Sequence, residues 1–229
     1  MKKVILFIVE GTTDERALGG ILNEIFKKDH KISFQILCGD ITSDEKSNPG
    51  NIIKKIVKQV NAKCAVEGLW NKDILKVVHL VDMDGAYVTE DFIIEDNNVD
   101  HIKYTKEEIR TRYVDKTKDR NKRKSEILNL LVKQKFINRS IPYEVYYFSR
   151  NLEHVLHDIH EDVSDKDKEI FAEEFSARFY KKTDKFIDFL HNKEFMAEGD
   201  YMSSWEYIRQ EKNSLHRHCN FHLFFDEYK

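Results

Sequence analysis

Regular alternation between strand-like apolar segments and segments of helical periodicity limits the folds open to this sequence more than any other feature. Residues 4–9 are an unbroken apolar run, as expected of a strand covered on both faces. Residues 31–38 and 73–85 are predicted as two further strands. Between the strands, residues 12–28 and 51–64 carry apolar side chains three or four positions apart, which is the spacing of a helix buried on one side. This order of elements is typical of a parallel sheet flanked by helices.

The rest of the chain extends this pattern and then becomes helical. A polar, charged insertion is expected at residues 87–118, and a helix with a basic start at residues 119–134. Residues 143–149 are predicted as a fourth strand, with a helix over residues 151–160 directly after it. From residue 164 onward the periodicity is helical, with no proline and one glycine.

The composition favours one α/β domain with a smaller helical region. The chain has 229 residues, of which 41% are hydrophobic and 34% charged, and only 8 glycines and 2 prolines. So few turn-forming residues argue against a sandwich of short strands. We expect an α/β domain at residues 1–160, with a mostly parallel, Rossmann-like sheet flanked by helices. Residues 161–229 are expected to form a helical region packed on that domain.

Cysteine usage and hydropathy predict a cytoplasmic protein without a membrane partner. Cys38, Cys64 and Cys219 are odd in number and widely spaced, as expected of reduced thiols. The apolar run at residues 4–9 is too short for a signal peptide and meets Glu10 without a small-residue cleavage site. No stretch approaches the roughly 18 apolar residues of a membrane span.

Acidic residues stand at the carboxyl ends of the predicted strands, where an open parallel sheet binds its ligands. Glu10 ends the first strand, and Asp14 follows it by about one helical turn. The third strand runs into Asp82 and Asp84, which strand alternation points to the same side. Glu153 lies in the first turn of the helix after the fourth strand. Five carboxylates at one edge repel one another unless a cation joins them.

Oxygen ligands in this number suit Mg²⁺ or Mn²⁺ rather than zinc. Two such ions, ~3.5–4 Å apart, stabilise the attacking and leaving oxygens of a phosphodiester displacement. The sequence therefore predicts a two-metal site at this edge of the sheet.

Some of these acids also have a purely structural interpretation. The segment Thr12–Glu15 fits a capping box, and acids in the first turn favour the helix dipole. This interpretation is sufficient for Glu15 and competes with the metal for Asp14 and Glu153. It explains Glu10 and the aspartate pair less well, because each interrupts an apolar run at the end of a strand.

The acidic motifs resemble those of Toprim domains. "IVEGTTDERAL" places a glutamate after the first strand, and "HLVDMDG" places a DxD pair after the third. Together with "SRNLEHVL", they resemble the Toprim nucleases of the OLD (overcoming lysogenization defect) type and their relatives in bacterial anti-phage systems. The resemblance covers residues 3–160. It implies that two divalent metal ions are held by five carboxylates: Glu10, Asp14, Asp82, Asp84 and Glu153.

The resemblance also implies two catalytic residues. Glu10 is expected to bind metal or to act as the base toward water. A lysine near the C-terminal end of the domain assists catalysis in OLD-type enzymes, and its best match here is Lys212. The expected activity is a divalent-metal-dependent endonuclease that hydrolyses phosphodiester bonds of DNA or RNA in anti-phage defence.

A second hypothesis keeps the fold but not the autonomous activity. Full OLD proteins carry an ATPase domain before the Toprim domain, and these 229 residues contain no match to it. The chain would then be an effector or binding subunit of a defence complex that an ATPase partner activates. A homodimer is also considered, because the aromatic stretch "FHLFFDEYK" is expected either in the core or in a dimer contact.

Two other motifs compete with this interpretation. "DMDG" resembles the start of haloacid dehalogenase-type phosphatases, but there the motif follows the first strand and continues into threonine. The histidines offer zinc ligands at His154, His157 and His160, and again at His216–His222, but their spacing matches no familiar zinc finger.

The segment "KTKDRNKRK", residues 116–124, is the main concentration of positive charge. Contact with nucleic-acid phosphates is its functional interpretation, and a solvated helix start is its structural one. Because the formal net charge is -3, such contact is expected to be local and salt-sensitive. The residues assigned to nucleic acid are Lys118, Arg120, Lys122, Arg123 and Lys124.

Overall fold

A five-stranded, mostly parallel sheet lies at the centre of the protein in the computed structural model, which describes residues 2–37, 39–159 and 163–228. The strands are β1 (Lys3–Val9), β2 (His30–Ile36), β3 (Ile74–Asp82), β7 (Phe136–Ile137) and β8 (Ile141–Phe148). Their order is β2-β1-β3-β8-β7, and only the edge strand β7 is antiparallel to its neighbour. The predicted α/β class with a mostly parallel sheet is confirmed, and β7 is the strand that was not predicted.

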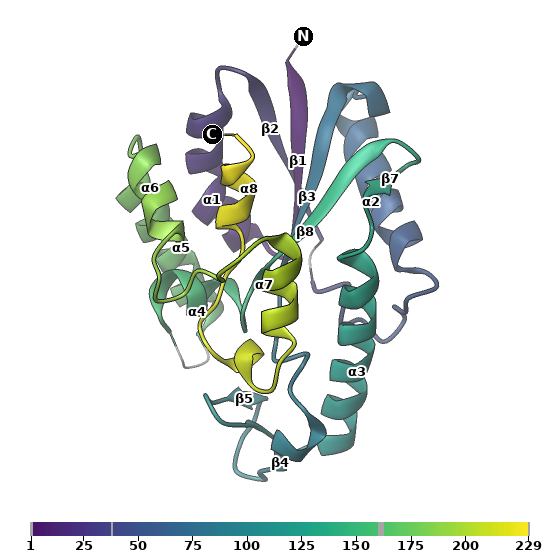
Figure 1. Cartoon of the computed structure of the whole chain (residues 1–229), viewed down its shortest axis with the longest axis vertical. Coiled ribbons are helices and arrows are strands. Elements are labelled where there is room, and N and C mark those ends of the chain that lie inside the picture. The colour runs from purple at the N-terminus through teal and green to yellow at the C-terminus, as the bar shows by residue number, and fades with distance from the viewer. Residues whose placement is uncertain (1, 38, 160–162, 229) are drawn as a thin grey trace.

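Helices cover both faces of this sheet (Figure 1). The helices are α1 (Thr12–Phe26), α2 (Ile52–Glu67), α3 (Val114–Leu131), α4 (Leu152–His157), α5 (Asp165–Phe179), α6 (Thr183–Leu190), α7 (Tyr201–Ile208) and α8 (His222–Asp226). Short 3-10 helices lie at Asn71–Asp73, Glu90–Phe92 and Asn213–Leu215. Side chains of α1, α4, α5, α6 and α8 build the core on one face, and those of α2, α3 and α7 build the core on the other.

Strand β1 shows why its sequence is apolar without interruption. Ile5, Phe7 and Val9 point into one core, whereas the alternate residues, among them Leu6 and Ile8, point into the other. All five side chains are fully buried. A central strand of a parallel sheet needs apolar residues on both sides, and the sequence provides them.

The charged insertion folds into a small sheet of its own. It contains β4 (Ile93–Glu95), β5 (Lys103–Tyr104) and β6 (Ile109–Thr111) in the order β4-β6-β5. Helix α3 then begins at Val114 rather than at residue 119, so the basic segment belongs to the helix from its first turn. The insertion lies beyond the carboxyl ends of the central strands (Figure 1).

The C-terminal helices share their core with the central sheet. Phe221 is fully buried and its ring lies edge-on to those of Phe7 and Phe148, at 6.2 and 6.0 Å between ring centroids. Phe224 and Phe225 are buried in the same core, so the aromatic stretch is a core element as predicted. The predicted boundary at residue 160 lies outside the described residues.

None of the helices in the described ranges is long and apolar enough to cross a bilayer.

Replacing Phe221 by alanine should lower the free energy of unfolding by about 3–5 kcal/mol, because it leaves a cavity where β1, β8 and α8 meet. Urea denaturation followed by circular dichroism measures this change. The matched control is Tyr180→Ala, at a side chain that is 61% exposed, which should change stability by about 0.5 kcal/mol or less. Equal stabilities of the two variants would contradict a shared core.

Candidate functional site

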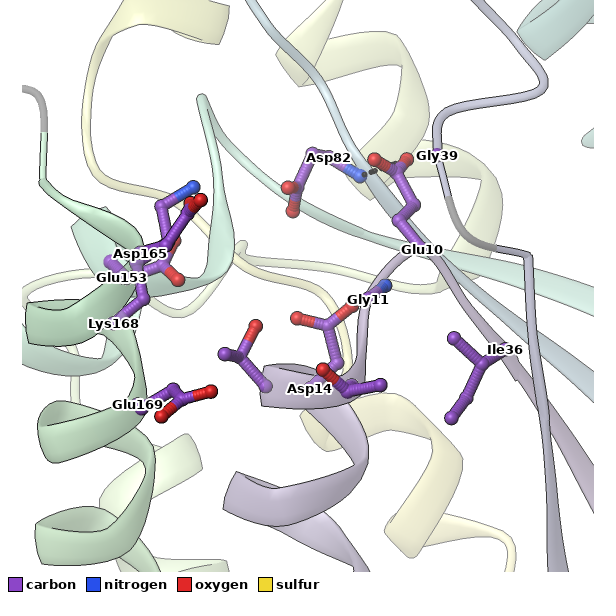
Figure 2. A pocket seen from close by; sticks show the side chains of 12 residues that line it. Glu10, Gly11, Asp14, Ile36, Gly39, Asp82, Glu153, Asp165, Lys168 and Glu169 are labelled. Atoms are coloured by element: carbon purple, nitrogen blue, oxygen red, sulfur yellow. Dashed lines mark hydrogen bonds between the residues drawn. The ribbon is translucent and has the colours of Figure 1, made fainter.

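A cavity of about 660 Å³ opens at the carboxyl ends of β1 and β3, between the sheet and helices α1, α4 and α5 (Figure 2). Four of the five predicted metal ligands line it: Glu10, Asp14, Asp82 and Glu153. Helix α5 adds Asp165, Lys168 and Glu169 on the opposite wall. The structure thus brings most of the predicted acids together and adds a wall that was not predicted.

The turn between β1 and α1 fixes the position of Asp14. Helix α1 begins at Thr12, and the backbone N–H of Gly11 donates a hydrogen bond to Asp14 Oδ2 at 3.0 Å. Asp14 therefore caps the helix with one oxygen, which confirms the capping interpretation that competed with the metal for this residue. The N-cap is Gly11, one residue before the predicted capping box at Thr12–Glu15. The capping bond also orients the Asp14 carboxylate at the cavity.

Glu10 and Asp82 lie on neighbouring strands and meet directly. The backbone N–H of Asp82 donates to Glu10 Oε1 at 3.3 Å (Figure 2). Both side chains keep some exposed area only because they face the cavity, and protein surrounds them on the remaining sides. The two carboxyl groups line the same cavity and the charge of Glu10 acts on Asp82, which favours protonation or a bound cation.

Burial is the main cause of the raised pKa values of Glu10, Asp14 and Asp82. Burial and the charge of Asp40 raise the pKa of Glu10 well above its ordinary value. Burial and the charge of Glu10 do the same for the pKa of Asp82. Burial raises the pKa of Asp14 to about 6, although the hydrogen bond from Gly11 opposes the shift. Removal from water thus disfavours the charged form of all three carboxyl groups.

Glu153 approaches the cavity from α4. It lies in the first turn of this short helix, whose start is capped by the Asn151 side chain accepting from the His154 N–H at 2.9 Å. Only 6% of Glu153 is exposed, and its carboxyl group lines the cavity. Glu153 can therefore interact with the helix dipole and line the cavity at the same time.

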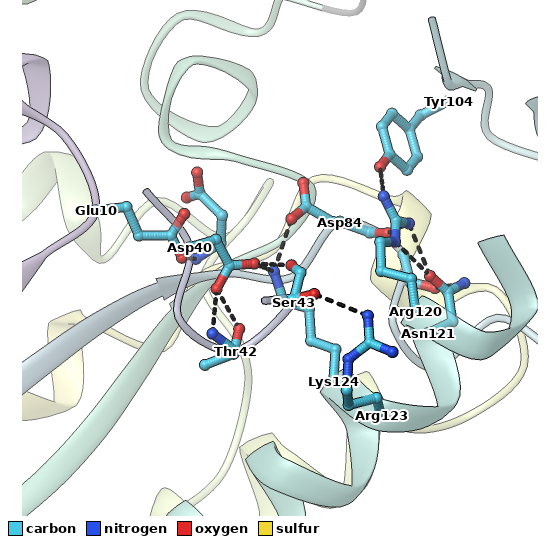
Figure 3. A network of polar contacts seen from close by, with 12 residues as sticks. Glu10, Asp40, Thr42, Ser43, Asp84, Tyr104, Arg120, Asn121, Arg123 and Lys124 are labelled. Carbon is cyan, nitrogen blue, oxygen red and sulfur yellow. Dashed lines mark hydrogen bonds and ion pairs between the residues drawn. The ribbon is translucent and has the colours of Figure 1, made fainter. Parts of the chain in front are cut away.

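Asp84, the fifth predicted ligand, is not among the residues that line the cavity, and Figure 3 shows it in a polar network with Lys124 and Asp40. Strand β3 ends at Asp82, and Asp84 adopts a left-handed backbone conformation with φ 48°. Gly85 follows at φ 65°, so the chain turns sharply there. The prediction that Asp82 and Asp84 point to the same side is wrong, because alternation holds only inside a strand.

The partner of Asp84 is the buried ammonium group of Lys124 on α3. Lys124 Nζ lies 2.6 Å from Asp84 Oδ2 and 2.6 Å from Asp40 Oδ2, and the lysine is fully buried. Burial alone would lower the pKa of Lys124, but the charges of Asp40 and Asp84 hold it well above its ordinary value. Lys124 was expected to contact nucleic-acid phosphates at the surface. This expectation is wrong for Lys124, because it has no exposed surface.

Asp40 is a member of this network that was not predicted. Its carboxylate accepts hydrogen bonds from Lys124, from the hydroxyl of Ser43, and from the backbone N–H of Thr42 at 2.7 Å. Burial alone would raise the pKa of Asp40, but the ammonium of Lys124 and these hydrogen bonds hold it well below its ordinary value. Asp40 follows the second predicted strand as Glu10 follows the first, so the same strand-end rule identifies it.

Two arginines of the basic segment also face inward. Arg120 donates to the carbonyl of Asp84 and to the hydroxyl of Tyr104, each at 2.9 Å (Figure 3). Arg123 donates to the carbonyl of Ser43 at 2.9 Å. These contacts hold the loop around Asp40 and the turn at Asp84.

The remaining two lysines of the segment face solvent. Lys122 is exposed, and Lys118 is half-buried with its ammonium 3.4 Å from Glu90. Their contact with nucleic acid stays a prediction.

The structure places Lys212 away from the cavity. Its ammonium lies 2.6 Å from Glu107 Oε2 and 4.1 Å from the centre of the Phe92 ring, so it packs on the charged insertion. Among the described residues that line the cavity, Lys168 of α5 is the basic side chain. The lysine suited to act at this cavity is therefore Lys168 rather than Lys212.

The histidines lie apart from this arrangement. His154 is buried with Nδ1 3.2 Å from the carbonyl of Ser149, and His157 packs against Phe175, while His160 lies outside the described residues. Over residues 2–37, 39–159 and 163–228, no group of three or more His, Cys, Asp or Glu side chains lies close enough together, as placed, to hold a metal ion. The donors at the cavity are all oxygens, which fits Mg²⁺ or Mn²⁺.

Comparison with models of protein families, with curated proteins and with solved structures finds no match to this chain.

Replacing Asp82 by asparagine should stabilise the metal-free protein at neutral pH. Asp14 shows the sign of the effect. Its pKa of about 6, against an ordinary 3.8, means that the folded protein binds this proton more tightly than the unfolded chain. The resulting stabilisation is complete below about pH 4 and is lost as the pH rises through about 6. The pKa of Asp82 is raised in the same direction.

We therefore expect Asp82→Asn to raise the free energy of unfolding at pH 8 on the order of 1 kcal/mol and to flatten its pH dependence. Chemical denaturation from pH 4 to 8 in chelator measures both. Glu126→Gln, at an exposed position on α3, is the control and should leave the curve unchanged. A less stable Asp82→Asn protein at pH 8 would contradict the assignment.

Proposed function

We propose that this chain is a Toprim-type, divalent-metal-dependent endonuclease that hydrolyses phosphodiester bonds of DNA or RNA. The observation that supports it most is the meeting of Glu10, Asp14, Asp82 and Glu153 at one cavity, at the carboxyl edge of a parallel sheet. This edge is where open α/β sheets bind ligands. The resemblance to OLD-type nucleases adds a role in anti-phage defence.

These four carboxylates would hold the metal. Burial of three charged carboxylates is unfavourable unless protons or a cation neutralise them, and a bound cation would do so at neutral pH. A bound Mg²⁺ or Mn²⁺ polarises a phosphate oxygen and lowers the pKa of its water. A carboxylate oxygen of Glu10 that the ion leaves free would accept the proton of the attacking water.

Lys168 would face the substrate across the cavity. Helix α5 packs against α1, where Arg16 lies 3.4 Å from Glu173 Oε1, and this packing sets the distance between Lys168 and the acids. A fixed positive charge there would stabilise the negative charge that develops on the phosphate. Lys118 and Lys122 are the proposed contacts to the nucleic-acid backbone.

The protein is proposed to act in the cytoplasm. Cys64 and Cys219 are buried free thiols, which suits a reducing compartment, and Cys38 lies outside the described residues.

Incubating the purified protein with plasmid, single-stranded DNA and total RNA tests the proposal. We expect cleavage of at least one substrate in Mg²⁺ or Mn²⁺ and none in chelator. Asp82→Asn should abolish cleavage because it removes a ligand, whereas Glu126→Gln should retain it. Full activity of Asp82→Asn would refute the proposed site. Activity that appears only with a co-purified ATPase would make the chain an effector subunit instead.

Lys168 and Lys212 can be separated by the same assay. Lys168→Ala should lower the cleavage rate by about 10²-fold, the usual effect of removing one group that stabilises the transition state. Lys212→Ala should retain nearly full activity, because its ammonium pairs with Glu107 outside the cavity. The opposite result would restore Lys212 as the catalytic lysine.

A further inference from the structure

Lys124 is a cation enclosed within the acidic edge of the sheet. It is fully buried, and its ammonium lies 2.6 Å from one oxygen each of Asp40 and Asp84. These acids follow two different strands, β2 and β3, and Figure 3 shows Glu10 at the end of β1 beside them. The ammonium thus occupies a position where three strand ends present carboxylates.

The two acids that bind Lys124 are themselves held in place. The backbone N–H of Asp84 donates to the carbonyl of Arg150 at 2.9 Å, and the carbonyl of Asp84 accepts from Arg120. Asp40 is held by Thr42 and Ser43. Neither acid is among the residues that line the cavity, and Oδ2 of each pairs with Lys124, although 26% of the Asp84 side chain stays exposed.

A lysine can replace a metal ion as a charge but not as a Lewis acid. Its ammonium is a compact point charge with three donors, and here two of them reach carboxylates. A buried ion pair of this kind is stable only when every charge in it is compensated. A divalent ion at Asp40 and Asp84 would place a second cation against the ammonium, which the short contacts leave no room for.

We propose that Lys124 takes the place of the second metal ion, so that this protein binds one divalent cation, at Glu10, Asp14, Asp82 and Glu153. The inference rests on the proposed function and narrows it. Lys124 is a positioning residue that orients Asp84 and neutralises the rear side of Glu10. The two-ion site expected from the sequence is the competing arrangement, with Asp84 as a ligand.

Counting bound Mn²⁺ on the wild-type protein tests this directly, by calorimetric titration together with electron paramagnetic resonance. We expect one ion per chain and a spectrum of isolated Mn²⁺. Two ions, magnetically coupled at a separation of ~3.5–4 Å, would overturn the inference and leave the proposed function standing. Failure to bind any ion would overturn both.

Two matched variants assign the site. Asp82→Asn should weaken Mn²⁺ binding by at least about tenfold. Asp84→Asn should keep one ion with an affinity within about threefold of wild type, since Lys124 still pairs with Asp40. A tenfold loss in Asp84→Asn would show that Asp84 binds metal and would overturn the inference.

Lys124→Met gives the complementary result. Without the ammonium, Asp40 and Asp84 lack a counter-charge, and we expect the count to rise to two coupled Mn²⁺ ions. Lys133→Met, at an exposed lysine just after α3, should keep one. A count that stays at one in a folded Lys124→Met protein would contradict the exchange of lysine for metal. If that variant does not fold, the wild-type count and Asp84→Asn decide the question.

Discussion

The ion pairs of Lys124 with Asp40 and Asp84 are the interaction on which the edge of the sheet depends. They join three segments that are distant in the sequence: the loop after β2, the turn after β3 and helix α3. Removing one partner of a buried ion pair costs about 3–5 kcal/mol, because the other charge stays buried without compensation. The basic segment of α3 is therefore largely structural, since Arg120 and Arg123 bind the same turn and loop.

The opposite side of Glu10 has a different character. There the carboxylates face a cavity. Burial raises the pKa values of Glu10, Asp14 and Asp82, because no lysine as close as Lys124 is to Asp84 compensates their charge on that side among the described residues. One glutamate thus stands between an internal cation and an open site. The two aspartates of the DxD motif therefore have different surroundings: Asp82 lines the cavity, and Asp84 pairs with Lys124.

The C-terminal helices complete the site. Helix α5 supplies the wall that carries Lys168, and the residues that follow it pack into the same core as β1. The buried rings of Phe221 and Phe224 lie against Phe7, two residues before Val9 and close to Glu10 along the strand. The helical region therefore helps to hold the acidic strand end in place, although the sequence described it only as packed on the domain.

The sequence by itself determined the order of the four parallel strands and of the helices between them, and the presence of Glu10, Asp14, Asp82 and Glu153 at one edge. These follow from local periodicity and from the rule that parallel strands end on the same side. Only the tertiary structure decided that Asp84 turns to Lys124, that Asp40 joins it, and that Lys168 rather than Lys212 faces the cavity. The physical reason is that these outcomes depend on a left-handed turn at Asp84 and on contacts between residues distant in the sequence, such as Asp40 and Lys124, 84 positions apart. Periodicity along the chain encodes neither.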